Sequence, residues 1–108
     1  MNIPHDKFCV LPWVSLEASP IGTVRPCCLA MDELTDETGE KFRLSTTPLD
    51  QIKNSQAMTN LRKQFLAGEK PQNCRRCWNE ERSGRKSKRM HTLDRLKHII
   101  GDNVQWTE

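Results

Sequence analysis

The 108-residue chain has no tyrosine and no apolar run of about 18 residues, the length that could cross a membrane. Its first residues, MNIPHDKFCVLPWV, lack the basic and apolar regions of a secretory signal. Only 35% of the residues are hydrophobic, and 29% are charged. So small a core suggests an added staple such as a set of disulfides or a metal, and cysteines at CxxC spacing in a reducing compartment favour the metal. We therefore expect a cytoplasmic domain, with no membrane partner, stapled by a metal site.

Acidic residues are scarce in one part of the chain, where the net charge of +3 arises. Residues 75–98 carry nine basic and three acidic side chains, whereas residues 1–74 carry eight basic and nine acidic ones. The basic run RSGRKSKR at 82–89 contains no aromatic residue to stack on a base. A contact with nucleic acid or with an acidic partner remains an alternative, but a solvated helical surface is favoured.

Turn residues predict an N-terminal β-hairpin followed by helices, which is a small α+β fold. Strand-like runs flank SPIG at 19–22 and predict a hairpin over about 13–27. Pro12 and Pro26 would then stand at its outer ends, where a missing amide donor is tolerated. The polar, acidic stretch over about 30–47 predicts a loop, with a short strand near 41–44.

Helical spacing begins at Pro48 and predicts helices over about 48–100. One short turn follows Pro48, and a second helix is predicted from a cap at Ser55 to Gly68. Two more helices are expected on either side of Gly84. We expect residues 1–100 to form one domain and residues 101–108 to form a tail or the start of a linker.

Five cysteines carry the chemistry. Cys74 and Cys77 form a CxxC at a predicted helix start, and the hairpin would bring Cys9 and Cys27 together. Four thiolates suit either tetrahedral zinc or a [4Fe-4S] cluster. Because zinc ribbons pair two CxxC motifs and Cys9 has no cysteine near it, the spacing favours the cluster. Cys28 is the less favoured ligand, since alternation would place it on the other strand face as a buried apolar residue.

The two blocks FCVLPWVSLEASPIGTVRPCC and MTNLRKQFLAGEKPQNCRRCWNEERSGRKSKR resemble the SPASM/twitch auxiliary iron–sulfur domain of radical SAM enzymes. The family spacing of Cys, 9 to 15 residues, Gly, four residues and Cys is met by Cys9, Gly22 and Cys27. Its next block begins with the CxxC at Cys74 and Cys77. Glu81, Ser87 and Arg89 are also similar, so the two latter residues are expected to contact Glu81 or a loop beside the cluster.

The resemblance implies one [4Fe-4S] cluster held by Cys9, Cys27, Cys74 and Cys77, as in the shorter twitch form, because no cysteine follows Cys77. It also implies an electron relay, or a role in positioning a peptide or other substrate, for a radical SAM core. The chain has no CxxxCxxC, so we expect no enzyme activity from it alone, with the core on another chain or in a C-terminal continuation. The alternative is a zinc-stapled module that contacts nucleic acid or a partner protein through its basic C-terminal helix.

Aromatic residues and histidines near the cysteines have ordinary structural explanations. Trp13 and Trp78 would shield the cluster from water or simply pack in the core. His5, His91 and His98 share no spacing with the cysteines and are expected at the surface.

Overall fold

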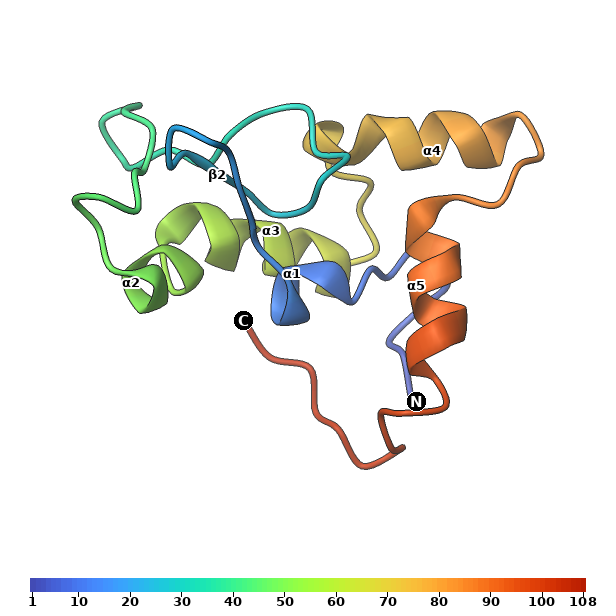
Figure 1. The fold of residues 1–108 in the computed structure, drawn as a ribbon. Helices are drawn as coiled ribbons and strands as arrows, with labels where there is room; N and C mark the ends of the chain where they lie inside the picture. The colour runs from blue at the N-terminus through green and yellow to red at the C-terminus, as the bar shows by residue number, and fades with distance from the viewer.

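The computed structural model describes residues 1–108 and consists of short helices and a two-stranded sheet that lies toward one side of the molecule (Figure 1). In chain order the elements are α1 (Leu11–Val14), β1 (Glu17–Ala18), β2 (Val24–Arg25), α2 (Leu49–Lys53), α3 (Gln56–Leu66), the 3-10 turn η1 (Gln72–Cys74), α4 (Arg75–Arg82) and α5 (Lys88–Leu96). The expected α+β fold of a hairpin followed by helices is confirmed. None of these helices has both the length and the apolar character needed to span a membrane.

The hairpin is tight. β1 and β2 are antiparallel, with Glu17 opposite Arg25 and Ala18 opposite Val24. The amide of Gly22 donates to the carbonyl of Ser19 at 2.9 Å and closes the turn. Gly22 has φ of 88°, a backbone conformation that favours glycine. This turn returns the chain so that β2 leads directly into the second cysteine block.

The hairpin is shorter than the predicted range of about 13–27. Residues 13 and 14 lie in α1, and Pro12 is buried in the first turn of that helix. Proline is compatible with this place because first-turn amides have no partner within the helix. The strand expected near residues 41–44 consists only of isolated bridges, of Arg43 with Thr23 and of Lys41 with Thr35.

The predicted helix from Ser55 is confirmed as α3. The Ser55 hydroxyl accepts from the amide of Met58 at 3.4 Å, and the chain leaves the helix at Gly68 with φ of 82°. The apolar face of α3 enters two buried clusters. One comprises Phe8, Cys9, Val10, Leu61, Phe65 and Trp78, and the other Val24, Leu34, Ile52 and Met58. α3 therefore joins the cysteine region to the hairpin region.

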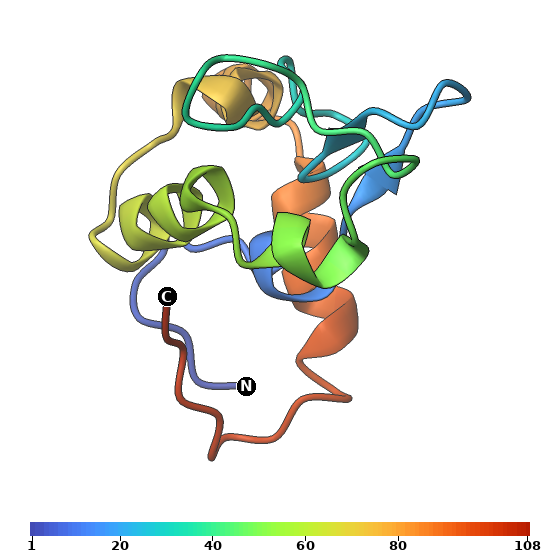
Figure 2. The same ribbon diagram turned by 90° about the vertical axis from the view of Figure 1, so that its left-hand side faces the viewer.

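α4 lies over α3, and α5 runs away from the end of α4 (Figures 1 and 2). Residues 101–108 return to the N-terminal segment, where the indole of Trp106 donates to the carbonyl of Asn2 at 2.7 Å. The same ring lies 5.0 Å from that of Phe8. The last residues thus pack on the segment that leads to Cys9.

Candidate metal centre

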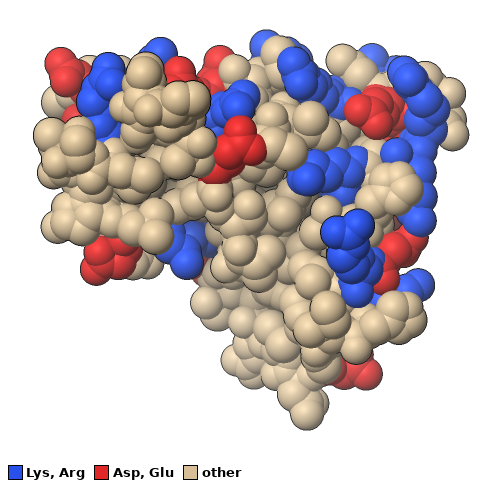
Figure 3. Space-filling model, viewed as in Figure 1, with Lys and Arg blue, Asp and Glu red and all other residues tan.

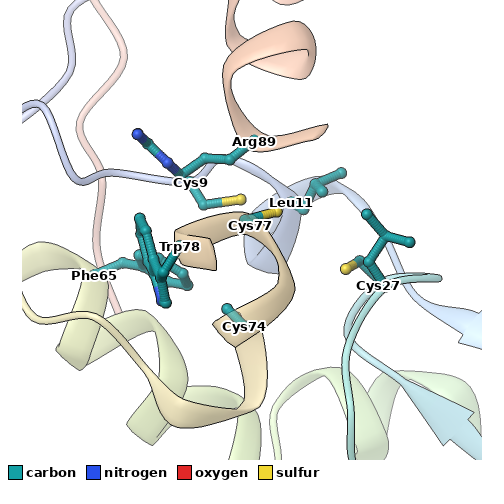
Figure 4. A pocket seen from close by; sticks show the side chains of 9 residues that line it. Cys9, Leu11, Cys27, Phe65, Cys74, Cys77, Trp78 and Arg89 are labelled. Carbon is teal, nitrogen blue, oxygen red and sulfur yellow. The ribbon is translucent and has the colours of Figure 1, made fainter. Parts of the chain in front are cut away.

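Four of the five cysteines line one small cavity of about 20 Å³. They come from three places in the chain, namely the segment before α1, the loop after β2 and the start of α4. The remaining lining is apolar except for one arginine. The lining residues are Cys9, Leu11, Cys27, Leu29, Phe65, Cys74, Cys77, Trp78 and Arg89 (Figure 4).

Cys9 lies in the most buried part of the chain, between Phe8 and Val10. Burial raises the pKa of its thiol to about 12, against the effect of a hydrogen bond from the amide of Leu11. The neighbouring thiols of Cys27 and Cys77 raise it further. These influences indicate a thiolate that is costly to hold without a counter-charge, and a metal centre supplies one.

Cys27 follows β2 and Pro26, in a turn whose amides are directed toward its sulfur. Burial raises the pKa of Cys27, while hydrogen bonds from the amides of Leu29 and Ala30 lower it. Amides of this kind stabilise a thiolate ligand. Cys28 is exposed and does not line the cavity, so the expectation that it is a buried apolar residue is wrong. β2 ends at Arg25, and strand alternation no longer governs residues 27 and 28.

Cys74 and Cys77 flank the first turn of α4. Cys74 closes η1, where its amide donates to the carbonyl of Pro71 at 3.0 Å, and Cys77 is buried one turn later. Burial raises the pKa of Cys74 to about 12, and the thiols of Cys9, Cys27 and Cys77 raise it further. The CxxC pair at a helix start therefore stands where the sequence predicted it.

A hydrogen bond between backbone atoms connects the segment of Cys27 to the segment of Cys74. The amide of Met31, four residues after Cys27, donates to the carbonyl of Asn73 at 3.0 Å. Since Asn73 directly precedes Cys74, this bond joins the segment that follows Cys27 to the segment that leads to Cys74. The sulfur atoms of Cys9 and Cys77 point toward a common space, which Cys27 faces from the opposite side (Figure 4).

The donor set fits an iron–sulfur group. Four thiols in an apolar surround are the usual ligands of iron–sulfur clusters. No group of three or more cysteine, histidine, aspartate or glutamate side chains is arranged to bind a single metal ion. A cluster has several irons, each of which takes one thiolate, so its ligands need not meet at one point.

Arg89 is the one charged residue in the cavity wall, and the expected contact of Arg89 and Ser87 with Glu81 is confirmed. Arg89 Nη2 donates to Glu81 Oε1 at 2.6 Å, and Arg89 Nε to Glu81 Oε2 at 2.9 Å. The Ser87 hydroxyl donates to Glu81 Oε2 at 2.6 Å. Part of the basic run at 82–89 is thus buried and bonded within the domain instead of lying on its surface.

The aromatic residues and histidines divide between site and core. Trp78 lines the cavity, whereas Trp13 packs on Phe8 with ring centres 5.0 Å apart and does not line it. His91 and His98 are exposed, and the ring of the half-buried His5 hydrogen-bonds the carbonyl of Phe65. None of the three histidines lines the cavity. Leu11 and Leu29, each two residues after a cysteine, add an apolar lining that the cysteine spacing did not predict.

Comparison with known proteins agrees with this geometry. A family model described as the SPASM iron–sulfur cluster-binding domain matches residues 9–78, more than half of the chain. No curated protein and no solved structure matches the chain. The matched range begins at Cys9, includes Cys27 and Cys74, and ends one residue after Cys77. The chain therefore belongs to the SPASM family of iron–sulfur cluster-binding domains.

Proposed function

We propose that this domain binds one [4Fe-4S] cluster through Cys9, Cys27, Cys74 and Cys77 and serves as an auxiliary cluster domain for a radical SAM core. The observation that carries the proposal is the meeting of these four thiols around one apolar cavity. When bound, such a cluster supplies one-electron transfer. With a cysteine on each of its four irons it would have no open iron, so the role is electron relay rather than direct binding of substrate.

The chain's own residues provide the surroundings that such a centre needs. Leu11, Leu29, Phe65 and Trp78 exclude water, and the amides near Cys9 and Cys27 donate toward the sulfurs. Exclusion of water and hydrogen bonds to sulfur are the main protein controls on a cluster's potential.

The alternative zinc-stapled module has less support. A single zinc needs four ligands about 2.3 Å from one point, and no set of side chains here is arranged in that way.

Lys and Arg side chains gather along the side of the molecule formed by α4 and α5 (Figure 3). We assign this surface to contact with a partner protein, namely the radical SAM core, because it has no exposed aromatic residues for stacking on bases.

We also propose a cytoplasmic location and a role near a peptide substrate. All five cysteines are free thiols, which suits a reducing compartment. The peptide role rests on the family resemblance alone, which implies a domain that helps to hold a peptide or other substrate near the core. Its test is the capture of a peptide by the domain together with its core.

The cluster proposal is tested by anaerobic purification followed by iron and acid-labile sulfide analysis. We expect a brown protein with about four irons and four sulfides per chain. Cys77→Ala should lose most of the iron, and Cys28→Ala is the matched control that should keep it. A colourless protein with one zinc and no sulfide, even after reconstitution, would contradict the proposal.

The auxiliary role is tested separately, with the radical SAM protein encoded beside this chain or continuous with it. Affinity purification of the cluster-loaded domain should retain that core, and the retention should weaken as salt rises if the basic side of α4 and α5 forms the contact. Arg76→Glu, a charge reversal at an exposed position of α4, should reduce it. Retention of no radical SAM protein from either source would overturn the auxiliary role.

A further inference from the structure

Arg89 connects the cavity wall to the segment that carries Cys9. Its Nη1 donates to the carbonyl of Asp6 at 2.7 Å and to that of Phe8 at 3.0 Å. These carbonyls lie on the N-terminal side of Cys9, the residue directly after Phe8. Arg89 therefore holds this segment against α5 although 80 positions separate the two residues in sequence.

The charge of Arg89 is confined to the interior. Only 6% of its side chain is exposed, and its guanidinium carbon lies 5.1 Å from the centre of the Trp78 ring. Both residues line the cysteine cavity. A charge in such a place is screened far less than one on the surface.

Glu81 balances this charge from outside the cavity. It lies four residues after Cys77 on α4, and both of its carboxylate oxygens accept from Arg89. Glu81 does not itself line the cavity, so the positive end of the pair is nearer to the four thiols than the negative end. Such a pair acts as a fixed dipole aimed at the centre.

We propose that Arg89 is a positioning residue that fixes the Cys9 segment and sets the reduction potential of the bound centre with its positive charge, while Glu81 limits that effect. The inference rests on the proposed function and deepens it. Reduction adds negative charge to the centre, and a nearby positive charge favours it. Loss of Arg89 therefore lowers the potential, and loss of the Glu81 charge raises it.

The opposite signs give a test that a merely structural role cannot imitate. Wild type, Arg89→Gln and Glu81→Gln are purified anaerobically with the cluster in place, and each is titrated with a low-potential reductant and redox mediators. The signal is the electron paramagnetic resonance of the reduced cluster. We expect a shift to more negative potential in R89Q and to more positive potential in E81Q. The double variant should lie between the two single variants.

Matched controls separate the local charge from the net charge. Arg95→Gln makes the same charge change as R89Q on the same helix, but at an exposed position with no side-chain bond. Its shift should be much smaller. Arg89→Lys retains the charge and should keep the potential near that of wild type. If R89Q fails to hold the cluster, E81Q and R89K decide the question.

Two results would overturn the inference. One is shifts of the same sign in R89Q and E81Q, and the other is a shift in R95Q as large as that in R89Q. Failure of the proposed function would differ from both, because then wild type itself would assemble no cluster and give no signal to titrate.

Discussion

Asn73 and Asp32 hydrogen-bond to each other in both directions, from positions 41 residues apart. The amide of Asp32 donates to Asn73 Oδ1 at 2.5 Å, and Asn73 Nδ2 donates to the carbonyl of Asp32 at 3.2 Å. Asn73 directly precedes Cys74, and Asp32 lies in the loop that follows Cys27. This reciprocal pair holds together two cysteine segments that the sequence places far apart.

Replacement of Asn73 by alanine should loosen this connection. Both side-chain bonds disappear, and we expect a loss of about 1–3 kcal/mol in the free energy of unfolding. The cluster should also be lost faster to an iron chelator, as followed by the decay of its visible absorption. Asn54→Ala is the control, because it removes a side-chain bond to Asp50 within α2, away from the cavity. Equal decay rates for the two variants would contradict the linking role of Asn73.

The adjacent thiols of Cys27 and Cys28 should behave in opposite ways. Cys27 lines the cavity and Cys28 is exposed outside it. Cys27→Ala should lose most of the bound iron, whereas Cys28→Ala should retain it, as measured by iron and sulfide content after anaerobic purification. Iron lost from the Cys28 variant and kept in the Cys27 variant would reverse the assignment of the ligand.

Alkylation of the metal-free chain should follow burial and pKa. Burial raises the pKa of Cys9 and Cys74 to about 12, so both are protonated at pH 7.5. Iodoacetamide should modify the exposed Cys28 first, as measured by peptide mass spectrometry. The rates at Cys9 and Cys74 should rise about tenfold per pH unit up to pH 9, in proportion to the thiolate fraction.

The same raised pKa values fix the sign of a stability effect. The folded metal-free chain holds these two protons more tightly than the unfolded chain, whose thiols have a pKa near 9.0. This contribution to stability is complete below pH 9 and is lost as the pH rises from 9 toward 12.

In the alkylation experiment, modification of Cys9 by iodoacetamide as fast as that of Cys28 at pH 7.5 would contradict the burial of Cys9 and show that the cavity is open.

Arg62 should be a strong determinant of stability. It is buried in α3, where its Nε donates to the carbonyl of Pro12 at 3.0 Å and its Nη2 to that of Lys53 at 2.7 Å. Arg62→Met leaves these acceptors without their donor, and we expect a loss of about 2–4 kcal/mol in the free energy of unfolding. Lys63→Met is the control at the neighbouring exposed position. A denaturant midpoint that is the same in both variants would refute this role.

Short sequence patterns predicted much of the fold and several residues of the site. The turn at Gly22, the cap at Ser55 and the helix end at Gly68 each depend on the chemistry of a few neighbouring residues, and all are confirmed. The family spacing through Gly22 singled out Cys27 rather than Cys28, and the cavity contains Cys27. Such features need no knowledge of distant contacts.

The missed features depend on contacts over long sequence distances. Pro12 suits a strand edge or a helix start equally well, and its place in α1 is accompanied by the bond from Arg62, 50 residues away. Cys28 was expected to be buried because the strand was extended two residues too far. The ion pair of Glu81 and Arg89 lies beside the thiols because α5 packs against the segment before Cys9. The hydrophobic periodicity of the sequence does not predict this packing.

Mössbauer spectroscopy of the chain loaded with iron-57 tests the central claim most directly. One [4Fe-4S] cluster with four cysteine ligands should give the averaged-valence iron pairs of an oxidised cluster, at about four irons per chain, with no iron differing in its ligands. The spectrum should be unchanged in Cys28→Ala. A spectrum of isolated tetrahedral iron, or a cluster with one iron lacking a thiolate, would contradict the assignment of Cys9, Cys27, Cys74 and Cys77 as the four ligands.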